Sequence, residues 1–285
     1  MIQTRINTND KNIGQVSKNN PGWRGSGEPS LKSLINQSFH NIKANLLKGN
    51  VRFFLNYQIQ VFANTKTFVF NKNKKIKICP CCKYSGPGFI ATSNDKRITY
   101  HSRCPNCDSR SRHRGLSIVL NQHLENKKLN LLFFAPEKVI LKILQSKKKN
   151  IKIKTTDYYS HDVDFPNQDI QELTFPDKSF DYILCNHVIE HVPKDDLAFK
   201  ELSRILNNGG KAIITIPGDY HLYDTVEFKS TDRNGHFRHY GLDVIKKMQL
   251  YFDKVEVIDM GSACKPEFGV RKNDLAFICY NLSKQ

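Results

Sequence analysis

Residues 165–217 of this 285-residue chain read FPNQDIQELTFPDKSFDYILCNHVIEHVPKDDLAFKELSRILNNGGKAIITIP. Residues 180–185 predict a short strand, because their apolar side chains show little alternation, as in a strand covered on both faces. Residues 195–206 have leucine and isoleucine at helical spacing, and residues 211–216 predict a second buried strand. The Asn208-Gly209-Gly210 turn is expected to end the helix. The order of strand, helix and strand predicts a parallel α/β sheet.

Five short motifs follow one another along this stretch. They are Asp169-Ile170, Leu173-Thr174-Phe175-Pro176-Asp177, Ser179-Phe180-Asp181, Glu190-His191 and Asn208-Gly209-Gly210. In this order they resemble the class I S-adenosylmethionine-dependent methyltransferases, most closely the type 11 group, over about residues 129–281. The resemblance implies a seven-stranded, mostly parallel Rossmann-like sheet, whose last strand, residues 275–280, runs antiparallel beside residues 254–259.

The turn after the first expected strand, residues 130–134, departs from the common pattern of this family. Such folds usually turn through Gly-x-Gly, because glycine lets the backbone approach the cofactor closely. This chain has Ala135-Pro136-Glu137 instead, and a zinc-ribbon-bearing subgroup that the chain resembles also carries an Ala-Pro-Glu turn. The resemblance therefore implies an S-adenosylmethionine site, and loss of the cofactor through the missing glycines is the alternative.

Ligands of such sheets bind beyond the carboxyl ends of the strands. Asp157 follows the second expected strand, residues 151–156, and the resemblance assigns it to the ribose hydroxyls of the cofactor. Asp169 and Ile170 match the pair that contacts the adenine, with the carboxylate at the amino group and the aliphatic chain over the ring. An ordinary role as a loop or cap residue is the alternative for each acid.

The resemblance also places residues at the methionine end of the cofactor. Ala135 and Glu137 would line that end, and Asn186 and His187 would face the sulfonium and the substrate. Because the sulfonium is already activated, methyl transfer needs mainly alignment of the nucleophile. An oxygen nucleophile also benefits from a general base, for which His187 is the first candidate.

Residues 218–240 are rich in polar and aromatic side chains and are expected to form part of the substrate wall. Their last part continues as GHFRHYG at residues 235–241, which resembles the Asp-His-Val-Arg-x-Tyr-Gly pattern of the ribbon-bearing subgroup. The resemblance makes His236 or His239 a second base or a substrate contact, and makes Arg238 and Tyr240 substrate contacts. The alternative is that these residues only brace the loop.

Residues 187–191 also spell H-x-x-E-H. On a continuous helix, this pattern would place His187 and His191 on one face as zinc ligands of a peptidase. The strand before it and the glycine turn after it favour the methyltransferase interpretation. A simpler alternative for His191 is a buried imidazole at a helix start that hydrogen-bonds the backbone.

Four cysteines stand as two Cys-x-x-Cys pairs, Cys79 with Cys82 and Cys104 with Cys107. Each pair can hold one metal ion through a tight turn, and two pairs make a closed tetrahedral zinc site that stabilises a hairpin too small to have a core. Disulfides are the alternative, although the expected cytoplasmic location would keep the thiols reduced. Cys81, inside the first pair, could replace a neighbour as ligand but is expected to be a bystander. The other three cysteines are expected to be small core residues.

The second cysteine pair is followed by Ser109-Arg110-Ser111-Arg112-His113-Arg114-Gly115, which leads into an expected helix. The ribbon-bearing subgroup also has an Arg-His-Arg triplet after a Cys-x-x-Cys pair, so the resemblance extends back to about residue 77. One interpretation makes Arg112, His113 and Arg114 a clamp for an anion or for the substrate. The other is a basic patch that pairs with acidic residues of the α/β domain.

The excess positive charge of the chain lies before residue 129. Residues 1–128 hold 22 Lys and Arg against 5 Asp and Glu, whereas residues 129–285 hold 22 of each kind. Such a basic segment attracts the phosphates of RNA, or an anionic membrane or glycan. The alternative is a solvated segment rich in lysine and asparagine.

We expect four parts along the chain. They are a flexible polar arm (1–30), a basic helical or aromatic segment (31–76), a zinc ribbon with a linker helix (77–128) and the methyltransferase domain (129–285). No apolar segment approaches the roughly 20 residues that cross a bilayer. The polar N-terminus lacks the apolar core of a signal peptide, which predicts a cytoplasmic protein.

Three functional hypotheses follow from the sequence. The first is S-adenosylmethionine-dependent O-methylation of a small-molecule or glycan-type substrate by an enzyme with structural zinc. The second is an RNA methyltransferase whose ribbon and basic arm bind the phosphate backbone. The third is a non-catalytic zinc-ribbon binding protein with a degenerate methyltransferase domain.

Overall fold

The computed structural model describes residues 51–94, 96–125, 128–147 and 150–282. The arm expected at 1–30 and the helix expected from Leu31 lie outside these residues. The chain divides into two compact units. One holds the chain up to Lys77 together with Tyr84–Asp108, and the other holds Ile78–Lys83 together with the chain from Ser109 onward.

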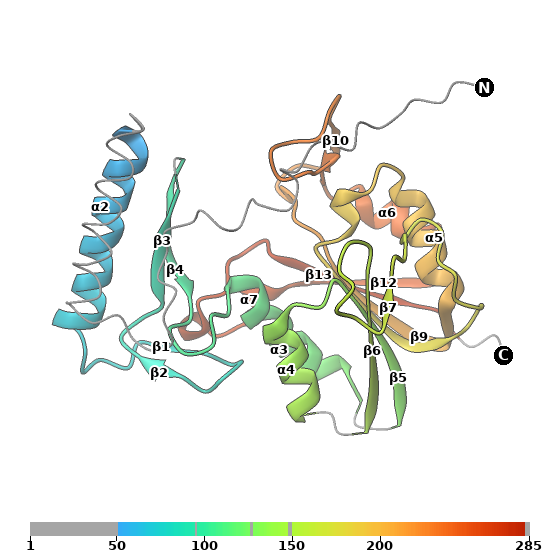
Figure 1. Ribbon diagram of the computed structural model, residues 1–285, viewed down its shortest axis with the longest axis horizontal. Coiled ribbons are helices and arrows are strands. Elements are labelled where there is room, and N and C mark those ends of the chain that lie inside the picture. Colours follow the sequence, from blue (N-terminus) through green and yellow to red (C-terminus); the bar gives the residue numbers. More distant parts are fainter. Residues whose placement is uncertain (1–50, 95, 126–127, 148–149, 283–285) are drawn as a thin grey trace. The chain divides into compact units, whose positions relative to one another are not determined.

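In the described residues of the first unit, a helix packs against a small antiparallel sheet (Figure 1). Helix α2 (Val51–Thr65) continues through a π-helical turn at Lys66–Phe70, so this aromatic-rich segment is helical. Strand β3 (Ile90–Ser93) pairs antiparallel with β4 (Ile98–Arg103). The short strands β1 (Lys77–Ile78) and β2 (Ser85–Gly86) form a separate pair.

Amide side chains of α2 hydrogen-bond the backbone and side chains along β3. The Nδ2 of Asn64 donates to the Ala91 carbonyl at 3.1 Å, and the Ala91 N–H donates to the Asn64 Oδ1 at 2.8 Å. One helical turn earlier, Gln60 Oε1 accepts from the Ser93 hydroxyl at 2.6 Å. Because an unpaired strand edge is open to association with other chains, these amides protect the edge of β3.

The second unit contains a seven-stranded sheet. Across the sheet the strands are β12 (Lys254–Asp259), β13 (Leu275–Tyr280), β9 (Leu206–Thr215), β8 (Phe180–Asn186), β5 (Leu129–Phe134), β6 (Ile151–Asp157) and β7 (Phe165–Pro166). The strands from β9 to β7 are parallel to their neighbours, and β13 runs antiparallel between β9 and β12. The predicted fold class is confirmed, including the antiparallel last strand.

Helices cover both faces of this sheet (Figure 1). On β5, Leu131 and Phe133 pack on one side with α3 (Ser111–His123) and α4 (Lys138–Lys147). The alternate residues Leu132 and Phe134 pack on the other side with α5 (Asp195–Ile205) and α6 (Val244–Gln249). Side chains that are apolar at consecutive positions are therefore buried on opposite faces, which is why the predicted strands lack alternation.

The glycine turn lies differently from its prediction. Helix α5 ends at Ile205 and β9 begins at Leu206, so residues 208–210 lie within the bounds of β9. The pairing of β9 with β8 jumps here from Leu206 to Lys211. Gly209, at φ 74°, donates its N–H to the Asn281 carbonyl, and Asn281 donates to Gly210. The glycines thus form an irregularity of the strand, held by the chain beyond β13, rather than a cap of the helix.

The remaining elements are short. Strands β10 (Val226–Glu227) and β11 (Arg238–His239) pair within the 218–240 insert. The chain also forms the 3₁₀ helix η2 (Ile189–His191), helix α7 (Met260–Ala263) and the 3₁₀ helix η3 (Pro266–Phe268). Among the helices of the described ranges, none is long and apolar enough to span a bilayer.

Candidate functional site

The carboxyl ends of four parallel strands bring the expected cofactor residues to one edge of the sheet. In the pairing register, Asn186 at the end of β8 lies opposite Thr215 at the end of β9. Phe134 at the end of β5 lies beside Cys185 on one side and Thr156 on the other. Ala135, Asn186 and Asp157 therefore follow or end three neighbouring strands at the same edge.

Two of these strands end in a left-handed turn. Ala135 after β5 has φ 45°, and His187 after β8 has φ 55°. Each residue donates its N–H to the last part of a neighbouring strand, Ala135 to the Thr156 carbonyl and His187 to the Thr215 carbonyl, both at 2.9 Å. Left-handed backbone is the conformation that glycine adopts freely. The Ala135 turn thus keeps a positive φ without the glycines of the usual motif.

The substitution Ala135→Gly is expected to raise the free energy of unfolding by up to about 1 kcal/mol. The left-handed conformation costs a residue with a Cβ about 1–2 kcal/mol, and the greater chain entropy of unfolded glycine offsets about half of that gain. Denaturant unfolding measures the difference. As a matched control, Ala198→Gly in the buried face of α5 should lower stability, and an equal loss for both variants would contradict the explanation.

Glu137 lies at the centre of a hydrogen-bond network behind this turn. Its Oε1 accepts from the Arg112 guanidinium and from His113 Nε2, the latter at 2.7 Å, and its Oε2 accepts from the Asn186 amide. Asn186 is itself buried and accepts from the Thr215 hydroxyl. Burial raises the pKa of Glu137, but the His113 hydrogen bond and the Arg112 charge outweigh it and lower the pKa to about 2. The carboxylate is therefore ionised at neutral pH.

The Arg112-His113-Arg114 triplet, in the first turn of α3, splits into two roles. Arg112 and His113 pair with Glu137. These two residues therefore behave as a basic patch that pairs with an acidic residue of the α/β domain. Arg114 is fully buried and donates to the carbonyls of Ser109, Phe268 and Gly269 at 2.7, 2.7 and 2.9 Å. Its guanidinium therefore joins the start of α3 to the loop around η3.

The two acids expected at the ribose and adenine each accept hydrogen bonds from their own loops. Asp157 Oδ1 accepts from the backbone of Tyr159 and Ser160, both at 2.7 Å. Asp169 Oδ1 accepts from the Gln171 N–H at 2.8 Å, and the neighbouring Ile170 is buried. These bonds fix the direction of both carboxylates at the edge of the sheet.

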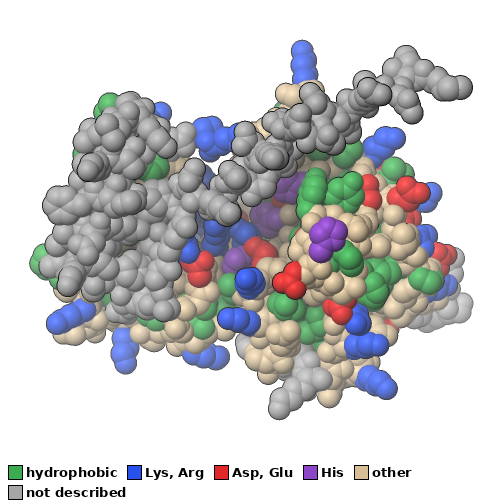
Figure 2. Space-filling view, in the orientation of Figure 1, with side chains coloured by type: hydrophobic (Ala, Val, Ile, Leu, Met, Phe, Trp, Pro, Cys, Tyr) green, Lys and Arg blue, Asp and Glu red, His purple; other side chains and the backbone are tan. Residues whose placement is uncertain are grey.

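Histidines gather where the 218–240 insert meets the end of β8 (Figure 2). The rings of His191 and His236 contact edge to face, with centroids 4.8 Å apart. His187 Nδ1 lies 3.4 Å from the Glu190 carboxylate, and the His187 side chain is 29% exposed. Burial lowers the pKa of His236 below its usual value, although nearby Asp232 opposes this shift. The insert thus supplies one imidazole to the strand-end site.

The H-x-x-E-H segment is not one continuous α-helix. His187 has left-handed backbone, and only Ile189–His191 are helical, as a single 3₁₀ turn. The peptidase arrangement, which needs both histidines on one α-helical face, is therefore absent from this segment. The alternative of a buried His191 is also wrong, because its side chain is 43% exposed. The expected backbone contact exists, with Nδ1 at 3.3 Å from the Gly235 carbonyl.

The other residues of the insert that were expected at the substrate are either buried with partners of their own or exposed. Arg238 is buried and donates to the carbonyls of Val192 and Pro193 and to Glu227. The Tyr240 hydroxyl donates to Asp195 at 2.9 Å, and burial raises its pKa, so it stays protonated. His239 is exposed on β11. Arg238 and Tyr240 thus brace the insert against the start of α5.

The two cysteine pairs form matching turns. Lys83 N–H donates to the Cys79 carbonyl at 2.9 Å, and Asp108 N–H donates to the Cys104 carbonyl at 3.0 Å. Lys83 and Asp108 also share a positive φ, 66° and 62°.

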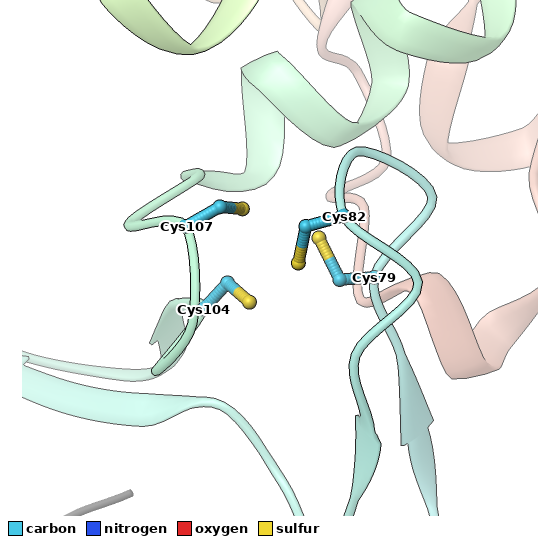
Figure 3. Close-up of side chains that lie close together, drawn as sticks. All are labelled: Cys79, Cys82, Cys104 and Cys107. Carbon is cyan, nitrogen blue, oxygen red and sulfur yellow. The ribbon is translucent and has the colours of Figure 1, made fainter. Parts of the chain in front are cut away.

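Together the pairs offer one set of sulfur ligands. The sulfurs of Cys79, Cys82, Cys104 and Cys107 lie within 4.8 Å of one another, and Figure 3 shows the four side chains pointing toward a common centre. None of the eight cysteines, all of which lie in the described ranges, forms a disulfide. Tetrahedral thiolate coordination is typical of structural zinc.

The other cysteines are outside this cluster. Cys81 packs against the core below α3, with its sulfur 3.5 Å from the His113 carbonyl. Cys185 and Cys279 are buried in the sheet core, as expected, and burial raises the pKa of both thiols. Cys264 is only half-buried.

Two acids that lie beside the site histidines, Glu190 and Asp232, were not among the expected site residues. Glu190 was recognised only as part of a motif, although its position between two histidines in H-x-x-E-H was a usable signal. Asp232, whose Oδ2 lies 3.5 Å from His236 Nδ1, had no sequence signal, because loop acids beside a histidine are common.

Comparison with known proteins gives a family match over the centre of the sheet. Residues 136–214 match the family model of a methyltransferase domain. The ubiquinone/menaquinone biosynthesis C-methyltransferase UbiE of Rhodopseudomonas palustris (strain BisB5) is 36% identical over 73 residues, 24% of this chain and 29% of that protein. Its counterpart from Bradyrhizobium sp. (strain BTAi1) is 34% identical over 77 residues, 25% and 30%. The chain spans less than a third of the length of these relatives.

Solved structures align with the chain at low identity. The PH0226 protein of Pyrococcus horikoshii OT3 aligns at TM-score 0.44 and 20% identity, covering 61% of this chain and 90% of that one. The 1,6-didemethyltoxoflavin-N1-methyltransferase of Burkholderia thailandensis aligns at TM-score 0.44 and 12% identity, covering 60% and 79%.

Proposed function

We propose that this chain transfers a methyl group to an oxygen atom of a small-molecule or glycan-type substrate. It carries a class I S-adenosylmethionine-dependent methyltransferase domain of the type 11 group. The single observation that supports this best is the strand-end geometry. Ala135, Asp157 and Asn186 stand at the carboxyl ends of three adjacent parallel strands, where ligands of such sheets bind. The left-handed turn at Ala135 leaves its backbone in the conformation of the missing glycine motif.

The residues at this edge fit the parts of the cofactor. Asp157 would accept the ribose hydroxyls, and Asp169 with the buried Ile170 would hold the adenine. A carboxylate has about four acceptor positions, and Glu137 uses three for Arg112, His113 and Asn186. The fourth suits the amino group at the methionine end.

The bound cofactor supplies a methyl group already activated on a sulfonium. The protein then has to align the acceptor oxygen and remove its proton. We assign the base to His187, because its ring stands directly beyond Asn186 and a carboxylate oxygen of Glu190 lies 3.4 Å from its Nδ1. The part-buried His236 is the second candidate, and the exposed His239 is the weakest.

We further propose structural zinc at the four clustered cysteines. Four thiolates within 4.8 Å on two matching turns suit tetrahedral zinc. The thiols would stay available in a reducing compartment, so a cytoplasmic location belongs to the same proposal.

Replacing Asp157 with asparagine tests the cofactor site. Asparagine keeps an acceptor for the backbone of Tyr159 and Ser160 but removes the charge that strengthens bonds from the ribose. We expect the affinity for S-adenosylhomocysteine to fall by about 1–3 kcal/mol, measured by calorimetric titration. Exposed Asp162, in the same loop, provides the control variant Asp162→Asn with unchanged affinity.

Calorimetry on the unmodified protein decides between the functional hypotheses. Micromolar binding of S-adenosylhomocysteine supports the enzyme, and no binding in folded, zinc-loaded protein favours the non-catalytic module. Equal affinity in Asp157→Asn and in the unmodified protein would remove Asp157 from the site.

RNA is the second candidate substrate, favoured by the excess of Lys and Arg in residues 1–128. It predicts RNA binding that weakens steeply with salt and that is reduced when residues 1–50, which precede α2, are deleted. Undiminished binding after this deletion would remove these residues from RNA recognition.

A further inference from the structure

Glu190 carries a buried carboxylate. Its side chain is 1% exposed, and among the described residues neither carboxylate oxygen has a hydrogen-bond partner. Burying an ionised carboxylate is strongly unfavourable unless a cation or several donors compensate it. The position of Glu190 beside the strand-end site therefore calls for a positive partner.

Imidazoles surround this carboxylate. The Glu190 Oε1 lies 3.8 Å from His191 Nε2 and 3.4 Å from His187 Nδ1. Ligand atoms of Glu190, His191 and His236 all lie within 4.8 Å of one another. Neighbouring ligands of a tetrahedral metal lie roughly 3.4 Å apart when the bonds are about 2.1 Å. Small rotations of the two partly exposed imidazoles would bring their ligand nitrogens to this spacing from Glu190 and from each other.

The Nδ1 atom of each of these two imidazoles, His191 and His236, lies near an acceptor. His191 Nδ1 lies 3.3 Å from the Gly235 carbonyl, which can only accept, so the tautomer that donates to it from Nδ1 leaves Nε2 available as a ligand atom. His236 Nδ1 lies 3.5 Å from the Asp232 carboxylate, which likewise favours a bare Nε2. Metal-binding histidines typically donate their second ring nitrogen to a carbonyl or carboxylate in this way.

Backbone contacts hold the two halves of the cluster together. The Phe237 N–H, next to His236, donates to the Glu190 carbonyl at 2.9 Å. Gly235 has φ 81°, a left-handed conformation that turns the loop back toward His191. The insert and the end of β8 are thus joined at the residues that bear the ligand atoms.

We propose that Glu190, His191 and His236 form a second metal site, separate from the cysteine cluster, for a divalent transition-metal ion such as Zn²⁺. Two imidazoles and one carboxylate are a common set of protein ligands for this class of ion, and three protein ligands leave a coordination position open. The metal charge compensates Glu190, and the exposed side of His191 gives the ion an entry path.

The open position has a consequence for the substrate, which rests on the proposed methyl transfer. A hydroxyl oxygen bound there has a lowered pKa, so the substrate would be an alcohol or phenol able to coordinate the ion. His187 takes the hydroxyl proton, and the oxygen then forms a bond to the methyl carbon. The carbon–sulfur bond breaks with its electron pair on sulfur, which gives S-adenosylhomocysteine.

Cobalt titration of the full-length protein, loaded with a single equivalent of zinc to fill the cysteine cluster, tests the site without cofactor or acceptor. We expect one further equivalent of Co²⁺ by calorimetry, with visible d–d absorption but without the thiolate-to-cobalt charge transfer of a cysteine site. Glu190→Gln and His236→Ala should each weaken this binding at least about 100-fold. His239→Ala, at an exposed histidine three residues from His236, should leave it unchanged.

Two results would overturn the proposal. One is the absence of a further Co²⁺ equivalent, as expected if a protonated imidazole is the partner of Glu190. The other is unchanged binding in Glu190→Gln and His236→Ala. If the buried Glu190 variant fails to fold, His191→Ala tests the same site at an exposed position. Because no cofactor is present, these outcomes are independent of whether the protein binds S-adenosylhomocysteine.

Discussion

Arg114→Met is expected to lower the free energy of unfolding by about 3–5 kcal/mol. The side chain is fully buried and donates to the carbonyls of Ser109, Phe268 and Gly269. Methionine retains most of the apolar volume but no donor. The buried Ser109 carbonyl and the part-buried Phe268 and Gly269 carbonyls then lose this partner, which costs up to about 1–3 kcal/mol for each. Denaturant unfolding followed by far-ultraviolet circular dichroism measures the loss.

Arg271→Met provides the matched control for this prediction. Arg271 is exposed and follows the same loop, so its replacement should change stability by no more than about 0.5 kcal/mol. Arg114→Lys should be intermediate, because one ammonium group cannot reproduce the planar fork that reaches several carbonyls. Similar stability of Arg114→Met and Arg271→Met would show that the buried hydrogen bonds are not needed for the fold.

Cys104→Ser is expected to abolish zinc binding at the cysteine cluster and to unfold residues 77–108. Structural zinc contributes about 10–16 kcal/mol of apparent binding free energy to small domains, which commonly unfold without it. The seven-stranded sheet has its own two apolar layers and should stay folded. Hydrogen exchange would show loss of protection at 77–108 and retained protection in β5, β8 and β9.

Cys81→Ser is the control for the zinc prediction, because Cys81 stands within the first pair but outside the cluster. It should keep full zinc content by elemental analysis. Undiminished zinc content and retained protection at 77–108 in Cys104→Ser would remove this cysteine from the metal site. Ordered structure at 77–108 in metal-free protein would contradict the zinc proposal itself.

The sequence predicted the sheet because its signals are local. Buried parallel strands read as apolar runs, and residues 180–185 and 275–280 form strands where those runs lie. The cysteine spacing predicted two turns, and both form with the same backbone hydrogen bond. These features depend on the period of the backbone and on short-range hydrogen bonds, which a sequence displays directly.

Errors and open alternatives arose where distant segments meet. The glycine turn was assigned to the end of α5, but Asn281 holds it within β9. The Arg-His-Arg triplet left two roles open, and packing divides it between Glu137 and the loop near Gly269. Sequence spacing marks none of these partners, because Asn281, Glu137 and Gly269 each lie more than twenty residues away from the residues they contact.

The sequence by itself determined the parallel sheet, the residues that follow its strands and the two cysteine pairs. Only the tertiary structure decided which basic side chains lie beside each buried acid. It surrounds Glu190 with imidazoles, one of them from the distant 218–240 insert, and it gives Glu137 two basic partners. The physical reason is that strand and turn patterns follow from neighbouring residues, whereas the compensation of a buried charge depends on side chains that only the packed chain brings together.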